Sequence, residues 1–252
     1  MHGLQRYFVN APASEGRFYI SGEDRHHIVR VMRGKIGDRI ICSASDGKSA
    51  VCTIAEITDD LVIATVVKWE EGSSELPVRV AIASGLPKGD KLETIIQKGT
   101  ELGAYEFIPF TAARSIVKWD DKKAGKKVER WQKIAKEAAE QSHRSRLPKV
   151  AAPVMFKELL ALSRGYDFKL VAYEEDAKAG ESSMLSRTFA SVEKGQSILI
   201  VFGPEGGLAD QEIAQLKEAG FISCGFGPRI LRTETAPLYA LAAVSYHFEL
   251  MR

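Results

Sequence analysis

The stretch SILIVFGPEGGL, residues 197–208, decides how this sequence folds. Its nearly continuous apolar run is typical of a strand that is buried on both faces, as in a parallel sheet. The run leads directly into a Gly-Pro-x-Gly-Gly turn, and residues 209–220 then have the pattern of a helix. In open α/β sheets, ligands bind at the carboxyl ends of strands. Glycines there let the backbone approach a ligand, although a tight turn without a ligand has the same pattern.

A second segment near the C-terminus repeats this layout. In CGFGPRILRTETAPL, residues 224–238, a short strand precedes a Gly-x-Gly-Pro turn, a polar stretch and a helix. Two such turns at neighbouring strand ends would enclose a cleft. The pair is therefore more specific for a ligand site than either turn alone.

Neither glycine-rich turn fits a known phosphate fingerprint. A Walker A sequence is absent. The run from Gly225 to Ile230 begins like GxGxxG but has Ile230 in place of the third glycine, and it does not lie on a first βα unit. The turns therefore favour a ligand held by backbone amides and carbonyls, such as an adenine with a short zwitterionic tail.

Around these turns, residues 73–252 alternate apolar strands with helices. The expected strands are 78–84, 107–110, 169–173, 197–202 and 223–227, and the expected helices are 90–103, 126–143, 209–220 and 236–251. This alternation predicts an α/β domain whose parallel sheet is covered on both faces.

Residues 1–72 have a different pattern. They consist mostly of short β-branched and aromatic runs, with a turn signal at Asp46-Gly47 and one helix between Ser21 and Gly34. The pattern predicts a small barrel. The polar segment 70–77, EEGSSELP, is then a linker to a second domain of residues 73–252.

Composition limits the class of protein. The chain has 252 residues, of which 45% are hydrophobic and 27% charged, which is ordinary for globular proteins. It has no apolar run long enough to cross a membrane, and its start, MHGLQRYFVNAP, has no signal-peptide pattern. Three scattered cysteines favour a reducing compartment over a zinc cluster or disulfides. We expect a cytoplasmic protein without a metal.

Basic charge is concentrated in residues 113–150. This stretch has 12 Lys and Arg against 5 Asp and Glu, although the whole chain has a net charge of only +2. Such a stripe binds nucleic acid or is simply a solvated helix face. A second basic cluster, with Arg25, Arg30 and Arg33, has the pattern of a phosphate-contacting helix. His26 and His27 within it have no third ligand nearby, so a metal is not expected.

Several of these motifs, in this order, resemble the bacterial RsmE family. They are GPEGGL, FGPRILRTETA, LPKGDKLETIIQKGTELG (86–103), Arg114-Ser115 and EQSHRSRLP (140–148). RYFV and HHIVRVMRGKIGD near the N-terminus fit the PUA-like RNA-binding domain of that family. The resemblance covers nearly the whole chain. RsmE enzymes are SPOUT-class methyltransferases that use S-adenosylmethionine to methylate uridine N3 in 16S ribosomal RNA of the small ribosomal subunit.

The resemblance implies a fold and a cofactor site. It implies a PUA-like β-barrel at 1–72 and a SPOUT domain at 73–252 whose loops 203–208 and 226–236 form a deep trefoil knot. S-adenosylmethionine would bind between these loops in a bent form. The residues that it would contact are Phe202, Gly203, Pro204, Glu205, Gly206, Gly207, Phe226, Gly227, Ile230, Leu231, Arg232, Thr235 and Ala236. The resemblance also favours a homodimer that buries the final helix, which by its pattern alone equally suits the core of a monomer.

Methylation of a ring nitrogen that carries a proton requires alignment and help with proton loss. We expect Arg232 and Glu234 near the methyl-transfer centre, with Arg114 also catalytic. Arginine holds phosphate or uracil oxygens well because its fork binds two acceptors. The arginines expected to contact RNA are Arg25, Arg30, Arg33, Arg114, Arg144 and Arg146. Surface charge for the last two, and a salt bridge from Arg232 to Glu205 or Glu234, remain open interpretations.

Three other functions remain open at this point. The chain could be a SPOUT enzyme acting on another RNA, such as transfer RNA. It could be an RNA-binding or ribosome-assembly protein without enzymatic activity, which would have no affinity for S-adenosylmethionine. An NAD-linked α/β enzyme is disfavoured by the broken GxGxxG pattern.

Overall fold

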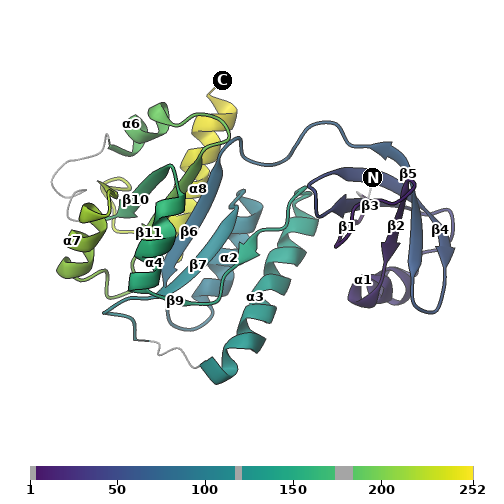
Figure 1. Ribbon diagram of the computed structural model, residues 1–252, viewed down its shortest axis with the longest axis horizontal. Coiled ribbons are helices and arrows are strands. Elements are labelled where there is room, and N and C mark those ends of the chain that lie inside the picture. Colours follow the sequence, from purple (N-terminus) through teal and green to yellow (C-terminus); the bar gives the residue numbers. More distant parts are fainter. Residues whose placement is uncertain (1–3, 117–120, 174–183, 252) are drawn as a thin grey trace. The chain divides into compact units, whose positions relative to one another are not determined.

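The computed structural model describes residues 4–116, 121–173 and 184–251 (Figure 1), with no side-chain description for 121–124. The chain divides into two compact units. The first consists of residues 1–75 and 139–147, and the second of residues 76–138 and 148–252. Within the described part of the chain, no helix is both long and apolar enough to span a membrane.

The first unit contains a small barrel-like sheet of five strands. They are β1 (Arg6–Val9), β2 (Arg17–Ile20), β3 (Arg39–Ala44), β4 (Ser49–Ile57) and β5 (Val62–Trp69), in the order β1-β3-β4-β5-β2. β1 is parallel to β3, and the other neighbours are antiparallel. The turn at Gly47, with φ +84°, joins β3 to β4 as the Asp46-Gly47 signal predicts. Phe18, Ile28 and Ile54 are fully buried in the core of this sheet.

The one predicted helix of the first unit is α1 (Gly22–His26), which continues as the π-helical turn η1 (His27–Val31). Ser21 precedes it with extended backbone, but its side chain makes no capping hydrogen bond. Ile28 faces the core of the sheet, whereas Val31 and Met32 are exposed. The helix is therefore shorter and less buried than its apolar pattern indicates.

The second unit contains the predicted parallel sheet. Its strands are β6 (Arg79–Gly85), β7 (Glu106–Thr111), β8 (Lys149–Val150), β9 (Val154–Met155), β10 (Phe168–Ala172), β11 (Ser197–Phe202) and β12 (Ile222–Cys224). The order is β12-β10-β11-β6-β7-β8, with β9 also paired to β7. All pairs are parallel. β8 and β9 were not expected, because two residues are too few to show a periodic pattern.

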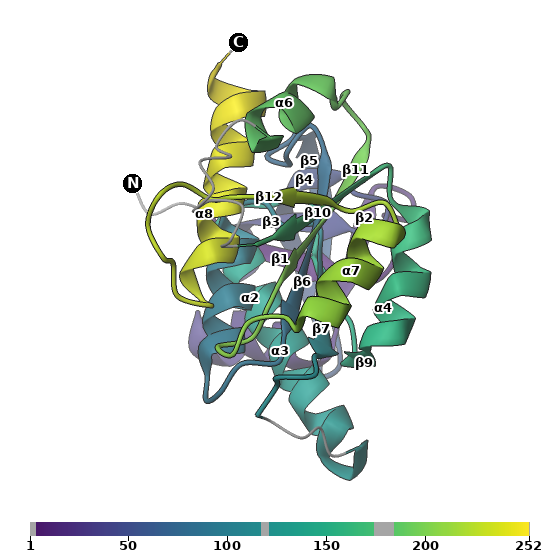
Figure 2. The same cartoon turned by 90° about the vertical axis from the view of Figure 1, so that its left-hand side faces the viewer.

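Helices cover both faces of this sheet, as predicted. They are α2 (Lys91–Glu101), α3 (Asp121–Gln141), α4 (Phe156–Leu162) with the 3-10 turn η2 (Ser163–Gly165), α6 (Met184–Ser191), α7 (Asp210–Glu218) and α8 (Thr235–Ser245) with the π-helical turn η3 (Tyr246–Leu250). Figure 2 shows α4 and α7 on one face and α2 and α8 on the other. The short α4 and α6 were not predicted.

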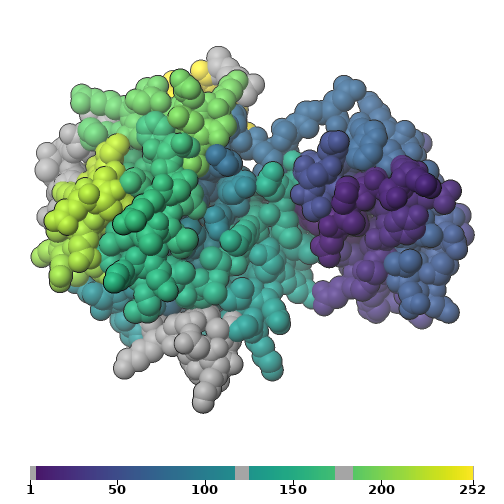
Figure 3. Space-filling view, viewed as in Figure 1, coloured from purple at the N-terminus to yellow at the C-terminus, as the bar shows by residue number. Residues whose placement is uncertain are grey.

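Alternate strand residues pack against the two helix layers. Ala81, Ala83, Leu199 and Val201 share a buried cluster with Leu159 of α4 and with Ile213 and Leu216 of α7. The side chains of α4 and α7 form much of the surface on that side (Figure 3). On the other face, a Cβ added at Gly99 of α2 would lie 2.8 Å from Phe107 and 3.4 Å from Leu241 of α8. Close packing there leaves the strand ends, and not the faces, open for a site.

Candidate cofactor and RNA sites

A cavity of about 680 Å³ lies at the carboxyl ends of neighbouring parallel strands in the second unit. Ala172 at the end of β10, Tyr173 just after it, Phe202 of β11 and Cys224 of β12 line it. The two glycine-rich segments supply most of the remaining lining. The predicted cleft between two such turns is therefore confirmed. Its volume is within the range of small-ligand sites.

The loop that follows β11 is built from close backbone contacts. Gly207 has φ +69°, and its amide donates to the carbonyl oxygen of Pro204 over 2.8 Å. A Cβ at Gly203 would lie 3.0 Å from the backbone of Gly207 and Leu208. At the end of β6, a Cβ at Gly85 would lie 2.5 Å from Cδ of Pro204. Glycine is required at these positions because the chain passes where a side chain would stand.

The second segment is held to the first by an aromatic contact. The rings of Phe226 and Phe202 lie 5.7 Å apart, and Phe226 also meets Tyr239 of α8 edge-on at 6.4 Å. Gly227 next to it has φ +83°. The amides of Thr235 and Ala236 donate to the carbonyl oxygen of Arg232 and begin α8. Both loops are thus fixed relative to each other through one buried aromatic pair.

Most residues that were predicted to hold the cofactor line this cavity. Those that do are Phe202, Gly203, Pro204, Glu205, Gly206, Gly207, Phe226, Gly227, Ile230, Leu231 and Ala236. Arg232 and Thr235 are not among the lining residues but adjoin them in the sequence, and both are exposed. Of the predicted catalytic residues, Arg114 lines the cavity, whereas Arg232 and Glu234 do not. The structure therefore gathers most of the predicted cofactor residues, together with Arg114, around one cavity.

Arg114 stands at the rim and supports the loop after β11. Its guanidinium donates to the carbonyl oxygens of Gly206 over 3.4 Å and Leu208 over 3.2 Å. The preceding residue is fixed by Glu212 of α7, whose carboxylate accepts from the amides of Ala113 and Ala209. Glu212 is buried, and our sequence reasoning did not include it. Its position three residues into a helix is the usual place for such a capping carboxylate.

Lys91, at the start of α2, connects the two loops electrostatically. Its Nζ lies 2.9 Å from Oε1 of Glu205 and 3.6 Å from Oε2 of Glu234. The described ion pairs of these carboxylates are therefore with Lys91, and not with Arg232 as one interpretation of the sequence held. Sequence reasoning missed Lys91. One signal was available, because a lysine in the first turn of a helix is unfavourable against the helix dipole unless a carboxylate lies nearby.

This cluster changes the pKa of two of its members. The hydrogen bond and the charge of Glu205 raise the pKa of Lys91. Partial burial acts to raise the pKa of Glu205, but the bond from Lys91 and the amides of Glu205 and Lys88 outweigh it and hold that pKa below its usual range. Both groups are therefore charged at neutral pH. Lys91 is therefore a cation that lies between the carboxylates of Glu205, which lines the cavity, and Glu234.

The arginines predicted to contact RNA divide into two groups in the first unit. Arg30 and Arg33 are exposed, and Arg33 has φ +55°. Arg25 is half-buried, and its guanidinium donates twice to the carbonyl oxygen of Thr58. Arg25 is therefore partly occupied in holding the loop between β4 and β5.

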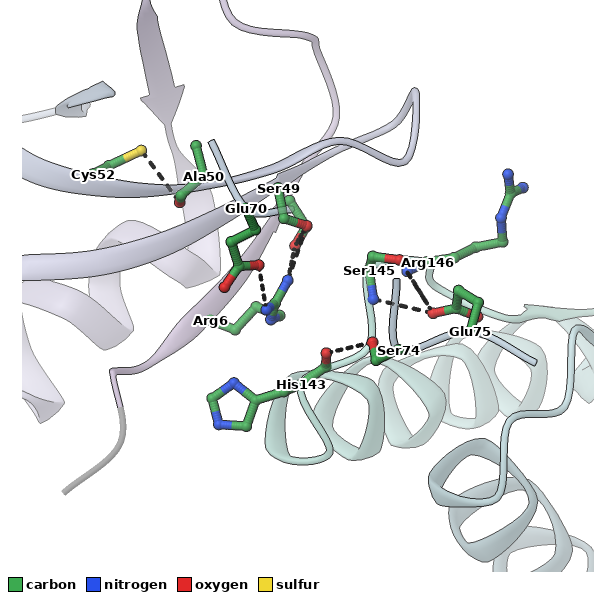
Figure 4. Close-up of polar contacts among 11 residues, drawn as sticks. Arg6, Ser49, Ala50, Cys52, Glu70, Ser74, Glu75, His143, Ser145 and Arg146 are labelled. Atoms are coloured by element: carbon green, nitrogen blue, oxygen red, sulfur yellow. Dashed lines mark hydrogen bonds and ion pairs between the residues drawn. The ribbon is translucent and has the colours of Figure 1, made fainter. Parts of the chain in front are cut away.

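Arg144 requires a correction. Its side chain is only 3% exposed, and its guanidinium is bonded to the carboxylate of Glu75. The amides of Ser145 and Arg146 donate to the same carboxylate over 3.0 Å and 3.1 Å (Figure 4). The side chain of Arg144 is thus buried in a structural pair and not exposed to RNA, whereas Arg146 is exposed. The predicted linker is fixed at Glu75 by these contacts and at Ser74 by its bond to the carbonyl oxygen of His143.

Among the described residues, His27 of the first unit is bonded to another side chain and not placed in a metal cluster. Nδ1 of His27 lies 3.0 Å from the hydroxyl of buried Tyr7, which gives this histidine a polar partner inside the unit. Across the described residues, no group of three or more His, Cys, Asp or Glu side chains is placed to hold a metal ion.

Comparison with known protein families gives the class of this protein. Residues 74–245 match the model of an RNA methyltransferase domain, and residues 20–67 match that of an RNA methyltransferase PUA domain. The first match covers more than half of the chain and includes both glycine-rich loops. The fold and the cavity therefore lie within an RNA methyltransferase domain.

Individual relatives narrow this class. The chain is 56% identical to ribosomal RNA small subunit methyltransferase E of Bacillus subtilis, over 99% of both chains. It is 32% identical to the Mycobacterium tuberculosis protein of the same name, over 94% of this chain and 89% of the relative. The crystal structure of the Neisseria gonorrhoeae enzyme of that name, bound to S-adenosylmethionine, matches with a TM-score of 0.83 and 28% identity, over 96% of this chain and 97% of the other. The chain belongs to the ribosomal RNA small subunit methyltransferase E family.

Proposed function

We propose that this chain is an S-adenosylmethionine-dependent methyltransferase that methylates N3 of a specific uridine in the 16S ribosomal RNA of the small ribosomal subunit. One observation carries the proposal. Two glycine-rich loops, 203–208 and 226–236, enclose a single cavity at the carboxyl ends of parallel strands. The family membership and the S-adenosylmethionine bound to the Neisseria gonorrhoeae relative support this cofactor.

The cavity fits the proposed cofactor in size and chemistry. Its volume of about 680 Å³ suits a ligand of this size. Apolar side chains such as Phe202, Phe226 and Leu231 offer a surface to an adenine, while the close backbone around Gly203 and Gly207 offers amides and carbonyls to polar groups. The thirteen residues predicted from the sequence remain our assignment for this site. Thr235 at the start of α8, and Arg232 three residues before it, would contact the cofactor.

When bound, S-adenosylmethionine supplies an electrophilic methyl group. The protein must align the uracil ring and favour loss of the N3 proton, because protonated N3 is a poor nucleophile. We assign Arg232 and Glu234 to this centre, with Arg114 at the rim. The guanidinium of Arg232 is exposed beside the cavity and can hold the uracil oxygens as negative charge develops. Glu234 is held in position by Lys91.

We assign RNA binding to the first unit and to the rim of the cavity. Arg30, Arg33 and Arg146 are exposed on the first unit, and Arg114 is exposed on the second. Arg25 supports the loop at Thr58 next to this surface. Phosphate contacts of this kind position an RNA without reading its sequence. A target base inside a helix must then leave the stack before its N3 is reachable.

The proposal includes a homodimer and a trefoil knot formed by the two loops, in a protein of the cytoplasm. The final helix supports both interpretations that its sequence allowed. Ala240, Leu241 and Val244 are fully buried within the chain. Tyr239, Tyr246 and Leu250 on α8 and η3 are exposed by 41%, 58% and 72%. A second copy that covered these apolar side chains would remove them from water, which favours association.

Three measurements test this function. Isothermal calorimetry should detect S-adenosylmethionine binding to the purified protein. Transfer of a labelled methyl group should occur to purified small ribosomal subunits and not to bulk transfer RNA. Mass spectrometry of the digested product should locate a single methyl group on uridine N3. If the protein binds RNA but has no affinity for S-adenosylmethionine, it is a non-enzymatic RNA-binding protein. If it methylates transfer RNA alone, the proposed substrate is wrong and transfer RNA takes its place.

A further inference from the structure

The first unit contains a cavity of its own, of about 920 Å³. It is enclosed by segments far apart in the sequence. These are the start of β1, the turn between β3 and β4, the end of β5 with residues 70–74, and the turn that follows α3. Neither the fold nor the proposed methyl-transfer site explains it. The volume is at the upper end of the range for small-ligand pockets and is large enough for a nucleotide.

Its wall is built around a buried arginine. Arg6 donates from Nη1 to the hydroxyls of Ser43 and Ser49, over 2.8 Å and 2.9 Å. Its Nη2 forms a 2.7 Å salt bridge with Glu70 (Figure 4). The side chain of Arg6 is 4% exposed, so this network is rigid and its charge is balanced inside the wall. The polar groups around it are preorganised, which reduces the entropy cost of binding a ligand.

Trp69 lines this cavity with part of its ring in solvent. The ring packs edge-on against the buried Phe18 at 6.2 Å, which fixes it, but 43% of the residue is exposed. Trp131, by comparison, is buried in the second unit. An indole fixed by the core with an open surface is the kind of platform on which single-stranded nucleic acid stacks its bases.

The charges around the cavity suit a phosphate backbone. Lys48 and Lys68 line it and are exposed. Arg146 extends toward the β3–β4 turn, because a Cβ at Gly47 would lie 4.0 Å from its Nη2. Glu70 is paired with Arg6, so Glu71 is the lining acid that remains to oppose these cations. Cations beside an aromatic ring are the combination with which proteins bind a single nucleic-acid strand, since the cations meet phosphates and the ring stacks on a base.

We propose that this cavity holds one unstacked nucleotide of the substrate RNA, outside the methyl-transfer site. Its base stacks on Trp69, and Lys48, Lys68 and Arg146 contact the adjoining phosphates. Ser73 and Ser74 also line the cavity. The inference rests on the proposed function for the identity of the RNA. It gives the first unit a specific anchoring point in addition to a general basic surface.

The test compares Trp69→Ala and Trp69→Phe with the unmodified protein. RNA affinity is measured by anisotropy with a fluorescein-labelled oligouridylate, and methylation by steady-state kinetics on small ribosomal subunits. Trp69→Ala should weaken oligouridylate binding about tenfold and raise KM for subunits by a similar factor, because the base no longer stacks on an aromatic ring. The kcat and the affinity for S-adenosylmethionine should not change. Trp69→Phe should keep most of the affinity, since its ring still stacks.

The lysines provide a second, independent measurement. Lys48→Ala with Lys68→Ala should weaken binding and reduce the slope of log affinity against log salt by about 0.7 for each phosphate that the protein no longer neutralises. Trp69→Ala should leave that slope unchanged. Matched controls are Val67→Ala, an exposed neighbour on β5 that does not line the cavity, and Lys157→Ala with Lys194→Ala, exposed lysines of the second unit.

The outcomes separate this inference from the proposed function. Unchanged oligouridylate affinity in Trp69→Ala, or a loss no larger than in Val67→Ala, overturns the nucleotide site. The nucleotide site is also overturned if Trp69→Ala weakens binding of free uridine monophosphate but leaves RNA binding unchanged. That result would indicate a site for a mononucleotide. Thermal melting shows whether Trp69→Ala is folded. If it is not, the RNA affinities of Trp69→Phe and of the double variant Lys48→Ala with Lys68→Ala test the nucleotide site instead. The two hypotheses can also fail separately. If Trp69→Ala weakens oligouridylate binding but the unmodified protein methylates no RNA, the nucleotide site is supported and the proposed activity is wrong.

Discussion

The cofactor cavity of the second unit and the nucleotide cavity of the first unit are built from different parts of the polypeptide. Close backbone packing shapes the first, because Gly85 and Gly203 let backbone segments approach where a side chain would stand, and Gly207 allows a turn with positive φ. Charged and aromatic side chains form the second, around Arg6 and Trp69. The first should therefore be sensitive to an added methyl group, and the second to the loss of a charge or a ring. Each variant below tests that difference.

The largest effect is expected at the methyl-transfer centre. Arg232→Ala and Glu234→Ala should each lower the single-turnover rate by roughly 100-fold or more, because a charged group that stabilises the transition state is removed. The affinity for S-adenosylmethionine should remain within a few-fold, since the cavity is lined mainly by other residues. Rapid-quench methyl transfer on small ribosomal subunits measures the rate, and calorimetry measures the affinity.

Arg187→Ala is the matched control, because Arg187 is an exposed arginine of α6 that does not line the cavity. Near-normal turnover in both the Arg232 and Glu234 variants would remove these residues from the centre. A loss for Glu234→Ala that Lys91→Met reproduces would show that the pair with Lys91, and not the carboxylate itself, is what matters.

Removing Glu75 should cause the next largest effect, on the stability of the first unit. Glu75→Ala leaves the buried guanidinium of Arg144 without its carboxylate and also releases the amides of Ser145 and Arg146. Breaking one side of a buried ion pair costs about 3 kcal/mol. Urea unfolding followed by circular dichroism measures it. Glu71→Ala, an exposed glutamate close by, should change the free energy of unfolding by less than about 0.5 kcal/mol.

If Glu75→Ala lowered the free energy of unfolding by no more than Glu71→Ala does, Arg144 would have found another partner or reached water. Arg144 would then be available to RNA after all, as the sequence originally indicated. The double variant Glu75→Ala with Arg144→Met separates the two cases, because an apolar side chain of similar length should recover part of the stability if the site is truly buried.

An added methyl group should damage the cofactor cavity without any change of charge. Gly85→Ala would place Cβ 2.5 Å from Cδ and 2.7 Å from N of Pro204, so the loop after β11 must move. Overpacking of this kind costs about 1–3 kcal/mol, which corresponds to a roughly 5- to 150-fold loss of S-adenosylmethionine affinity if the cost falls on the bound loop. Calorimetry measures it. Gly165→Ala, which would meet nothing within 4 Å, is the control and should bind normally.

These variants also show how much of the molecule its sequence could predict. The buried strand 197–202, both glycine-rich loops and the parallel sheet follow from local patterns, because strand burial and close backbone approach each demand particular residues. The partners of charged residues do not follow from local patterns, because they lie far away in the sequence. Lys91 meets Glu205 across 114 positions, and Ala113 meets Glu212 across 99. Arg144 and Arg146 lie two residues apart, yet one is buried and the other exposed. Only the fold decides which arginine finds a carboxylate.

Charge reversal on the first unit should have a smaller effect, on RNA binding alone. Arg30→Glu with Arg33→Glu should weaken oligouridylate binding and reduce the slope of log affinity against log salt by about 0.7 for each phosphate that is no longer neutralised. Anisotropy titrations at several salt concentrations measure both. Lys157→Glu with Arg164→Glu makes the same change of charge on exposed residues near α4. Equal slopes in the two double variants would mean that Arg30 and Arg33 contribute only net charge.

The smallest effect is expected from the Lys91 cluster as the pH falls. Because its folded-state pKa is lowered, Glu205 stabilises the folded state above its unfolded pKa of about 4.3, and this contribution is lost as the pH falls through the lower folded pKa. Melting temperatures of the unmodified protein and of Glu205→Gln should therefore differ by less than about 2 °C at pH 7 and converge below about pH 4, since exposed pairs contribute little. Lys91→Met should abolish most of the difference. A gap between the two curves that instead widened on acidification would show that burial, and not Lys91, dominates the titration of Glu205.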